Sequence, residues 1–327
     1  IITLFLRFLL KDAIHHPPLN HIFTTTFISF FGLNHIIVRL SYLIPFWFFL
    51  ILLFKQIKDF FDEKTSISFI LCIATFPFLL IASVTPDHSI WSSFIFTYLL
   101  FYIFLKKNID YRLCVLIISI GILFRITVFS GFLLIAATFI GDFINKKFLL
   151  KEKIKFLILN QKIILIFLIF FPLLFISALG TPAFEGVESV NPISYFLKAI
   201  KSKVIFYSLI KQIPAWYYLF IIPLFFARRK IEILCFFIFN LIIYFSVNPV
   251  LWGNAKYVLE YGVPFFLLGH LIFVKYLFDK KKLFLISMIN VMIIFLNIYD
   301  VYKFPGSRIS ADLVYDRGYG EVLKNKE

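Results

Sequence analysis

Long apolar runs alternate with short charged loops along most of the chain. A helix of about 20 apolar residues crosses a bilayer core roughly 30 Å thick, and it satisfies its backbone hydrogen bonds without water. The pattern therefore predicts an all-α, polytopic helical membrane protein with about ten membrane helices. The runs lie near residues 36–54, 66–84, 89–105, 112–124, 126–141, 163–179, 214–227, 231–248, 257–274 and 283–299.

A further apolar stretch, residues 19–31, differs from these runs in its length. About 13 residues are too few for an ordinary crossing, and three consecutive threonines at 24–26 interrupt the apolar character. Short amphipathic helices lie in the membrane interface instead of spanning it. We therefore expect an interfacial helix over 19–31, before the first crossing.

Basic side chains are concentrated in alternate loops. Short loops that carry Lys and Arg stay on the cytoplasmic side of a membrane, and this bias sets the orientation of a multi-pass protein. The turns 85–88 and 249–255 contain neither Lys nor Arg, so they are predicted to face the non-cytoplasmic side with residues 15–18 and 180–213. Counting 19–31 as a crossing would break this alternation. The basic loops are 55–64, 106–112, 142–162, 228–230 and 275–282.

This topology divides the chain into two predicted parts. Residues 1–301 are predicted to form one transmembrane domain. Residues 302–327 form a polar tail on the outer face, with Pro305 and Gly306 as helix breakers, and are interpreted as the start of a soluble segment. The chain begins with Ile1 and shows no signal peptide pattern, so we expect that an upstream part is missing.

Composition supports the membrane assignment and indicates which kind of binding partner the charged loops have. Hydrophobic residues make up 61% of the 327, with 47 Phe and a mean hydropathy of +0.94, whereas soluble domains are nearer half apolar. The net charge of +15 resides in the loops, so it indicates anionic lipid headgroups and not nucleic acid. Cys72, Cys114 and Cys235 have no paired spacing, which argues against a disulfide framework or a metal site.

An acidic residue stands in the turn SVTPDHSIW between two apolar runs. Asp87 is costly there unless it reaches water, and ionisable groups in such places usually serve function. It can equally cap the helix that starts near Ser89, by accepting hydrogen bonds from unpaired N–H groups. Both roles stay open, and one side chain can fill both.

Arg125, in GILFRITVFSG, separates two short apolar halves with no acid close in sequence. A guanidinium at the outer end of a broken helix pair is well shaped to hold a phosphate through paired hydrogen bonds. The alternative is an arginine that snorkels to lipid headgroups. Gly121 and Gly131 mark the break, and broken helices line cavities more often than they face lipid, which favours the phosphate.

Two further cations lie at predicted outer helix starts. Arg39 begins the first crossing and is interpreted as an interfacial anchor. Lys256 precedes Tyr257, an amphipathic ring typical of the membrane interface, and it can neutralise a phosphate. Lys256 also stands four residues before Glu260, so a helical Lys–Glu pair is predicted.

The corner HHPPLNHIF joins titratable rings to a rigid backbone. Pro17 and Pro18 fix φ and suit the first turn of a helix, so they hold His16 rigidly. His15 and His16 with a carboxylate could bind a divalent metal. Because no HxxxH or HExxH spacing is present, interfacial hydrogen bonding is favoured and no metal ligand is assigned. His270, deep in a crossing, is interpreted as a packing histidine.

Four stretches resemble, in order, a known family of membrane enzymes. HHPPLNHIFTTTFISFFGLNHIIVRLSYLI resembles the hPPL…lfG…Rl block of polyprenyl-phosphate-dependent glycosyltransferases of the GT-C type, in the protein mannosyltransferase and aminoarabinose transferase group. PDHSIWSSFIFTYLLFY, GILFRITVFSGFLLI and AKYVLEYGVPFFLLG agree with the same group, the last with Lys256 where arginine is usual. The resemblance spans most of residues 15–275 and implies a GT-C-like fold.

The resemblance also implies roles for individual residues. Asp87 matches an acidic position near the active site, and His16 with Pro17 borders the donor site. A phosphate leaving group needs cations to stabilise its growing charge, and a carboxylate can orient or deprotonate the acceptor. The implied sets are Asp87 and His16 for catalysis, Arg125, Lys256, Tyr257 and Arg39 for the lipid phosphate, and Pro17, Pro18 and His88 for the shape of the site.

One feature of the family is missing from the chain. Its members carry an acidic residue, often Asp-Glu, in the first outer loop before the HPP corner, and that acid is thought to act as the base. Only Asp12 precedes the corner here, and it is too close to His15 to match. Either the acid lies in a missing upstream part, which we favour, or the chain is inactive.

The sequence thus predicts a membrane glycosyltransferase that moves a hexose or pentose from a polyprenyl phosphate to an acceptor outside the cytoplasm. The acceptor class (protein, glycan or lipid) stays open, as does a divalent metal, and no other cofactor is indicated. The expected location is the inner (plasma) membrane of a bacterium in preference to the ER membrane. The alternatives are an inactive glycosyltransferase-like subunit and a transporter or flippase of lipid-linked sugar. A transporter binds its substrate at the bilayer midplane, so Arg125 at the midplane would favour it and Arg125 near the outer surface would favour the enzyme.

Overall fold

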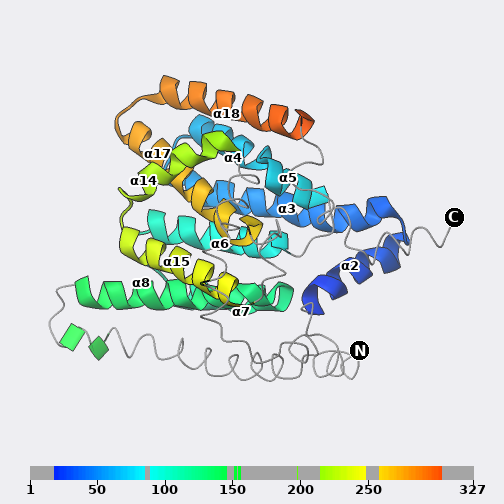
Figure 1. Cartoon of the computed structure of the whole chain (residues 1–327), viewed down its shortest axis with the longest axis horizontal. Helices are drawn as coiled ribbons and strands as arrows, with labels where there is room; N and C mark the ends of the chain where they lie inside the picture. The colour runs from blue at the N-terminus through cyan, green and yellow to red at the C-terminus, as the bar shows by residue number, and fades with distance from the viewer. Residues whose placement is uncertain are drawn as a thin grey trace.

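The computed structural model describes residues 18–84, 89–145, 151–152, 154–155, 197, 214–247 and 258–303, and all their regular structure is helical. The helices pack side by side as a bundle (Figure 1), which confirms the all-α, polytopic class. Their bounds are α2 (Pro18–Phe31), α3 (His35–Lys58), α4 (Glu63–Ala74), α5 (Pro77–Val84), α6 (Ser89–Leu105), α7 (Tyr111–Phe124), η2 (Ile126–Ser130), α8 (Gly131–Asn145), η3 (Ala215–Phe220), α14 (Ile221–Leu224), α15 (Lys230–Val247), η5 (Val258–Gly262), α17 (Val263–Asp279) and α18 (Leu283–Lys303).

Four helices are long and apolar enough to cross a membrane: His35–Lys58, Thr127–Ile144, Glu260–Asp279 and Leu283–Val301. Several other apolar helices are shorter, at 10–17 residues. Membrane-spanning helices are thus confirmed, but the described residues do not reach the expected total of about ten. The predicted run near 163–179 lies outside the described residues.

Breaks in the chain account for the shorter helices. The predicted run 66–84 is divided, since α4 ends at Ala74 and α5 begins at Pro77. Proline starts a helix well but would remove a hydrogen bond from the interior of a continuous one. Asp110 is the N-cap of α7, because its side chain accepts hydrogen bonds from two backbone N–H groups of the first turn.

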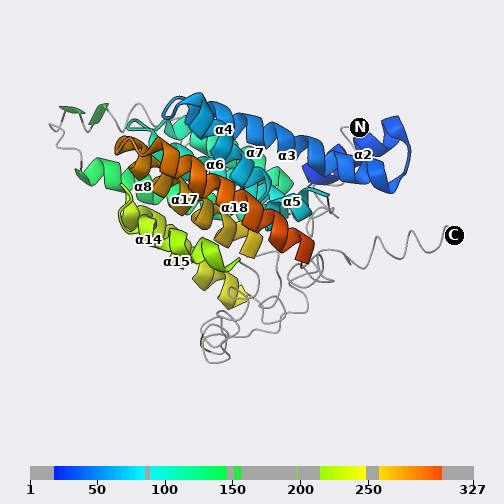
Figure 2. The same ribbon diagram turned by 90° about the horizontal axis from the view of Figure 1, so that it is seen from above.

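The basic loops lie together at one end of the bundle, here named the basic end. It comprises the ends of α3, α6, α8 and α17 and the starts of α4, α7, α15 and α18. Lys106 Nζ lies 3.5 Å from Asp59 Oδ2, which joins the α6–α7 turn to the α3–α4 turn. The Phe61 and Phe278 ring centroids are 5.2 Å apart, which joins the α3–α4 turn to the end of α17. Figures 1 and 2 show the α17–α18 turn at the same end of the bundle as the end of α8. The described parts of the basic loops therefore share one end of the molecule, as their charge pattern predicts. The side of a membrane that each end faces stays a prediction.

α2 confirms a helix over residues 19–31. It ends where Gly32 takes a left-handed φ of 83°, which glycine adopts without a Cβ clash, and the chain reverses into α3. α2 packs on α3 and α7, and the Phe23 ring lies edge-on to Trp91 with centroids 6.3 Å apart. Its place in the membrane interface stays a prediction.

α17 and α6 pack against each other at the centre of the bundle. Within Glu260–Asp279, 78% of the apolar stretch is buried inside the protein, so little of this helix is left for lipid. Gly269 allows α17 to approach η3, because a Cβ there would overlap the backbone carbonyl oxygen of Phe220. Glu260, a residue of the candidate site described below, lies in η5, directly before this buried helix.

α18 buries little of its surface in the bundle, since only 28% of its apolar stretch is buried. Hydrogen bonds from asparagine side chains join it to the other helices. Asn290 donates to Ser68 Oγ at 2.9 Å and its Oδ1 lies 3.1 Å from His270 Nε2. Asn297 donates to the Tyr217 hydroxyl at 3.1 Å. Bonds of this kind help hold transmembrane helices together where burial of apolar surface gives no gain. His270 is thus a packing histidine, as predicted.

Candidate functional site at the Arg125 end

The opposite end of the bundle, named here the Arg125 end, comprises α2, the start of α6, the junction of α7 with η2, and η5. Arg125 lies in extended backbone between α7 and η2, with φ −153° and ψ 120°. Gly121 lies one turn earlier in α7, where a Cβ would stand 2.5 Å from Ile95 Cδ1 and 2.8 Å from Val128 Cγ1. This glycine therefore lets α6, α7 and η2 converge beside Arg125.

Arg125 forms a buried ion pair with Glu260 of η5. Arg125 Nε donates to Glu260 Oε1 at 2.6 Å, and the two side chains are 12% and 0% exposed. Moving two charges out of water is costly, so such a pair contributes positioning more than net stability. No acid lies close to Arg125 in sequence, as noted above, and its partner in space comes from a segment 135 residues away. Lys256, the partner predicted for Glu260, lies outside the described residues.

The Arg125–Glu260 pair lies beside the end of α7 and the start of α6. Close by, Ser92 Oγ is 3.2 Å from Thr127 Oγ1, and the Trp91 ring stacks on Phe124 with centroids 4.5 Å apart. Trp91 and Ser92 belong to the first turn of α6, and the glutamate of the pair is the first residue of a membrane-spanning stretch. Arg125 is therefore near an end of the bundle, and its depth in the membrane stays a prediction.

An apolar groove of about 430 Å³ runs between α3, α6 and α7. Phe48, Leu52 and Ile120 on its walls are exposed, so the groove opens on the outer surface of the bundle. Trp91 and Phe124 also line it, and the residue after Phe124 is the arginine of the ion pair. An apolar groove with a cation beside one end suits an amphiphile that has an anionic head and a hydrocarbon tail.

Three of the predicted site residues lie in the described part of the chain. Arg125 is in the ion pair, and Pro18 is the first residue of α2, as expected for a proline at a helix start. Arg39 is exposed on α3 and makes no ion pair with the described residues. That position agrees with an interfacial anchor and does not join Arg39 to the Arg125–Glu260 pair. The predicted site residues outside the described part are His16, Pro17, Asp87, His88, Lys256 and Tyr257.

The described residues that border these positions meet at the Arg125 end. α2 begins at Pro18, α6 at Ser89 and η5 at Val258. Phe23 of α2 contacts Trp91 of α6, and η5 packs on α6. Segments that are far apart in sequence are thus brought together there, as the family resemblance implies.

A metal site was left open by the sequence. Across the described ranges, no group of three or more His, Cys, Asp or Glu side chains could hold a metal ion. His15, His16 and Asp87, the residues considered for a metal, lie outside those ranges.

Sequence reasoning missed a second buried cluster, which lies at the basic end. Asp142 accepts hydrogen bonds from Arg229 Nη2 and from the Tyr111 hydroxyl, each at 2.6 Å. The hydrophobic pattern places Asp142 and Arg229 in the basic loops 142–162 and 228–230. The only local signal was an aspartate directly after an apolar run, and sequence position alone could not identify the arginine 87 residues away.

Similarity to known proteins agrees with the resemblance drawn from the motifs. Residues 15–176 match the family model described as dolichyl-phosphate-mannose-protein mannosyltransferase. No curated protein and no solved structure is significantly similar to the chain. The matched segment includes α2, α6, α7 and Arg125, whereas Glu260 lies beyond it.

Proposed function

We propose that the donor of this protein is a sugar carried on a polyprenyl phosphate. Residues 15–176 match the dolichyl-phosphate-mannose-protein mannosyltransferase family model, which supports a membrane glycosyltransferase of the GT-C type. The enzyme transfers this hexose or pentose to a protein, glycan or lipid at the non-cytoplasmic face. The observation that carries the proposal is the apolar groove beside the buried Arg125–Glu260 pair.

The groove suits the tail of such a donor. A polyprenyl chain that is already in a bilayer gains little from the hydrophobic effect on entering an apolar groove. The groove therefore acts through its shape, by aligning the tail along α6 and α7 so that the phosphate reaches the level of Arg125. Trp91 and Phe124 stack on each other at 4.5 Å and give that end a rigid aromatic wall.

The reaction needs positive charge at the phosphate. The bond between the anomeric carbon and the phosphate oxygen breaks, its electron pair stays on the phosphate, and the acceptor oxygen bonds to the carbon. Cations fixed beside the leaving oxygen stabilise the growing charge. Arg125 supplies one such cation and Glu260 fixes the orientation of its guanidinium through the 2.6 Å bond. Lys256 is proposed as a second cation.

The remaining roles rest on the family resemblance. Asp87 takes the acceptor proton or orients the acceptor, and His16 borders the donor. Tyr257 and Arg39 complete the contacts to the lipid phosphate region. The proposed location is the bacterial plasma membrane with the Arg125 end outward, because the basic loops lie at the other end.

The groove can be tested with the full chain in lipid vesicles and a radiolabelled polyprenyl-phosphate sugar. Leu52 lines the groove and is partly exposed, so Leu52→Trp places an indole in the path of the tail. We expect KM for the long-chain donor to rise about tenfold with kcat little changed, because uniform binding is lost. A donor with a very short tail should be much less affected.

Ile51→Trp is the matched control. Ile51 is the neighbouring residue of α3, is exposed, and does not line the groove, so its substitution should leave KM unchanged. Equal effects of the two tryptophans, or none, would contradict the placement of the tail. A folded protein that transfers no sugar from any polyprenyl phosphate would support the inactive alternative instead.

A further inference from the structure

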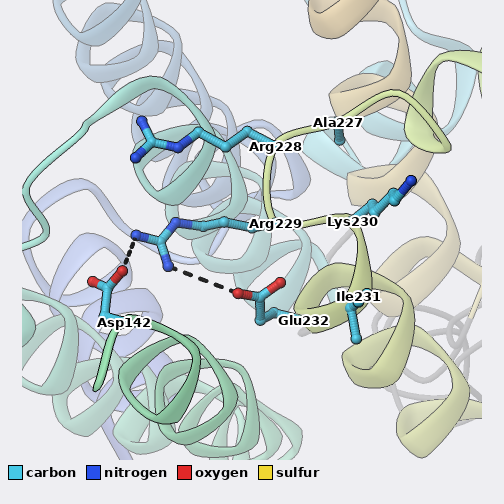
Figure 3. Close-up of a pocket in the computed structure, with 7 residues that line it drawn as sticks. All are labelled: Asp142, Ala227, Arg228, Arg229, Lys230, Ile231 and Glu232. Atoms are coloured by element: carbon cyan, nitrogen blue, oxygen red, sulfur yellow. Dashed lines mark hydrogen bonds and ion pairs between the residues drawn. The ribbon is translucent and has the colours of Figure 1, made fainter. Parts of the chain in front are cut away.

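A second cavity, lined by several charged side chains, lies at the basic end, at the start of α15. It has a volume of about 390 Å³ and includes the three consecutive cations Arg228, Arg229 and Lys230 in its lining (Figure 3). This end of the molecule is opposite to the Arg125 end, so the cavity is separate from the proposed glycosyltransferase site.

Arg229 is held in place by acids on one edge of its guanidinium. Nη2 donates to Asp142 Oδ1 at 2.6 Å, and Nη1 lies 3.9 Å from Glu232 Oε1. The arginine takes a left-handed backbone with φ 65°, which is unfavourable for a non-glycine residue because its Cβ comes too close to the following carbonyl oxygen. Strain of this kind is kept where the surroundings fix a particular side-chain position.

One donor of this buried arginine has no partner. The Arg229 side chain is only 6% exposed, and its Nε makes no hydrogen bond with any described residue. A buried donor without an acceptor is destabilising, because it has lost its hydrogen bonds to water, and more so when the group is charged. An oxygen atom of a bound anion would remove that cost.

Arg228 supplies the second half of an anion site. Figure 3 shows the Arg228 and Arg229 side chains running side by side, with Asp142 and Glu232 beyond Arg229 as seen from Arg228. Arg228 is exposed and makes no ion pair with the described part of the chain. Two adjacent guanidinium groups with no acid between them match the oxygen atoms of a phosphate.

The surroundings indicate a lipid as the source of this phosphate. Phe225, Phe226 and Ile231 flank the three cations and are all exposed, Phe226 at 81%. Exposed apolar side chains directly beside cations match the boundary between acyl chains and headgroups. We propose that Arg228 and Arg229 bind the phosphate of an anionic glycerophospholipid at the basic end.

The test uses the purified full chain in detergent micelles and measures phospholipid binding by native mass spectrometry. Phosphatidylglycerol should bind, and phosphatidylcholine, which has no net charge, should bind at least about tenfold more weakly. Arg228→Gln should weaken phosphatidylglycerol binding by about tenfold. Arg228→Lys should keep part of the affinity, since it retains the charge but loses the planar fork.

Lys282→Gln is the control, because it removes one exposed charge from the α17–α18 turn at the same end. It should leave binding unchanged if the site is specific. Equal losses in Arg228→Gln and Lys282→Gln would overturn the site in favour of general attraction to the basic end. Inorganic phosphate that displaces phosphatidylglycerol at micromolar concentration would overturn the lipid as the ligand and assign the site to a soluble phosphate. Arg229 is left unchanged because its removal would take away the cation that pairs with the carboxylates of Asp142 and Glu232.

Discussion

Replacing Glu260 separates the structural role of the Arg125–Glu260 pair from its proposed chemical role. Glu260→Leu removes the acid and leaves the Arg125 charge in a site where the two side chains are 0% and 12% exposed. The double variant Arg125→Met/Glu260→Leu removes both charges and keeps similar volumes. If the pair has a chemical function, the two variants should differ in stability but both should lose activity.

The expected size of the effect follows from the geometry. Two unit charges about 4 Å apart attract by about 4 kcal/mol at an effective dielectric constant of about 20. Breaking a buried pair costs about 3–5 kcal/mol, whereas replacing both partners by apolar residues is often neutral or stabilising. We therefore expect Glu260→Leu to lower the free energy of unfolding by about 3–5 kcal/mol, and the double variant to recover most of that loss.

Reversible unfolding of the full chain in mixed micelles measures the stability of each variant, and transfer from a labelled polyprenyl-phosphate sugar measures its activity. A double variant that is folded yet transfers no sugar would support contact between Arg125 and the phosphate. A double variant that is as active as the unmodified protein would refute that role. If Glu260→Leu lowers the free energy of unfolding by less than about 1 kcal/mol, the burial of the pair is refuted, because exposed ion pairs contribute no more than that.

Three further substitutions test the packing, each measured by the same unfolding experiment. Gly269→Ala should destabilise by about 1–3 kcal/mol, because its Cβ would overlap the carbonyl oxygen of Phe220; an unchanged midpoint would argue against this close approach. Asn297→Leu should cost about 1 kcal/mol through lost hydrogen bonds between helices, and a gain in stability would show that these bonds are dispensable. Asp142→Asn should cost more than Asn297→Leu, because Arg229 stays charged and buried at 6% exposure; the opposite order would contradict the buried cluster at the basic end.

Helix positions were predictable because the bilayer dictates the length of an apolar run. α6 occupies 89–105, and α18 begins at Leu283, both as the hydrophobic pattern predicts. Breaks within an apolar run were harder to place. Thr75 and Phe76 are followed by a proline at the start of α5, and a continuous apolar stretch hides such a division because both halves have the same composition.

The pairing of Glu260 with Arg125 could not be predicted from local spacing. The rule that residues four apart face each other on a helix offers Lys256, which lies outside the described residues, so that pair stays a prediction. Among the described residues, Glu260 pairs with Arg125 of another segment. Pairings between helices depend on which helices are neighbours, and a hydrophobic pattern does not encode that. The charge pattern did predict which turns group at one end, since orientation in a membrane depends on loop charge alone.

The candidate site is built from two separated parts of the chain. Residues 15–176, which match the family, contribute the groove and Arg125, but the acid that fixes Arg125 is Glu260 of η5. α17, which follows η5, is also the helix that packs against α6, so the same segment supplies the counter-charge and much of the support for the groove's central wall. A fragment limited to the matched residues would therefore leave the arginine without its acid and α6 without its main packing partner. The family match identifies a segment that encodes part of the proposed chemistry, and the C-terminal helices are required to hold that segment in position.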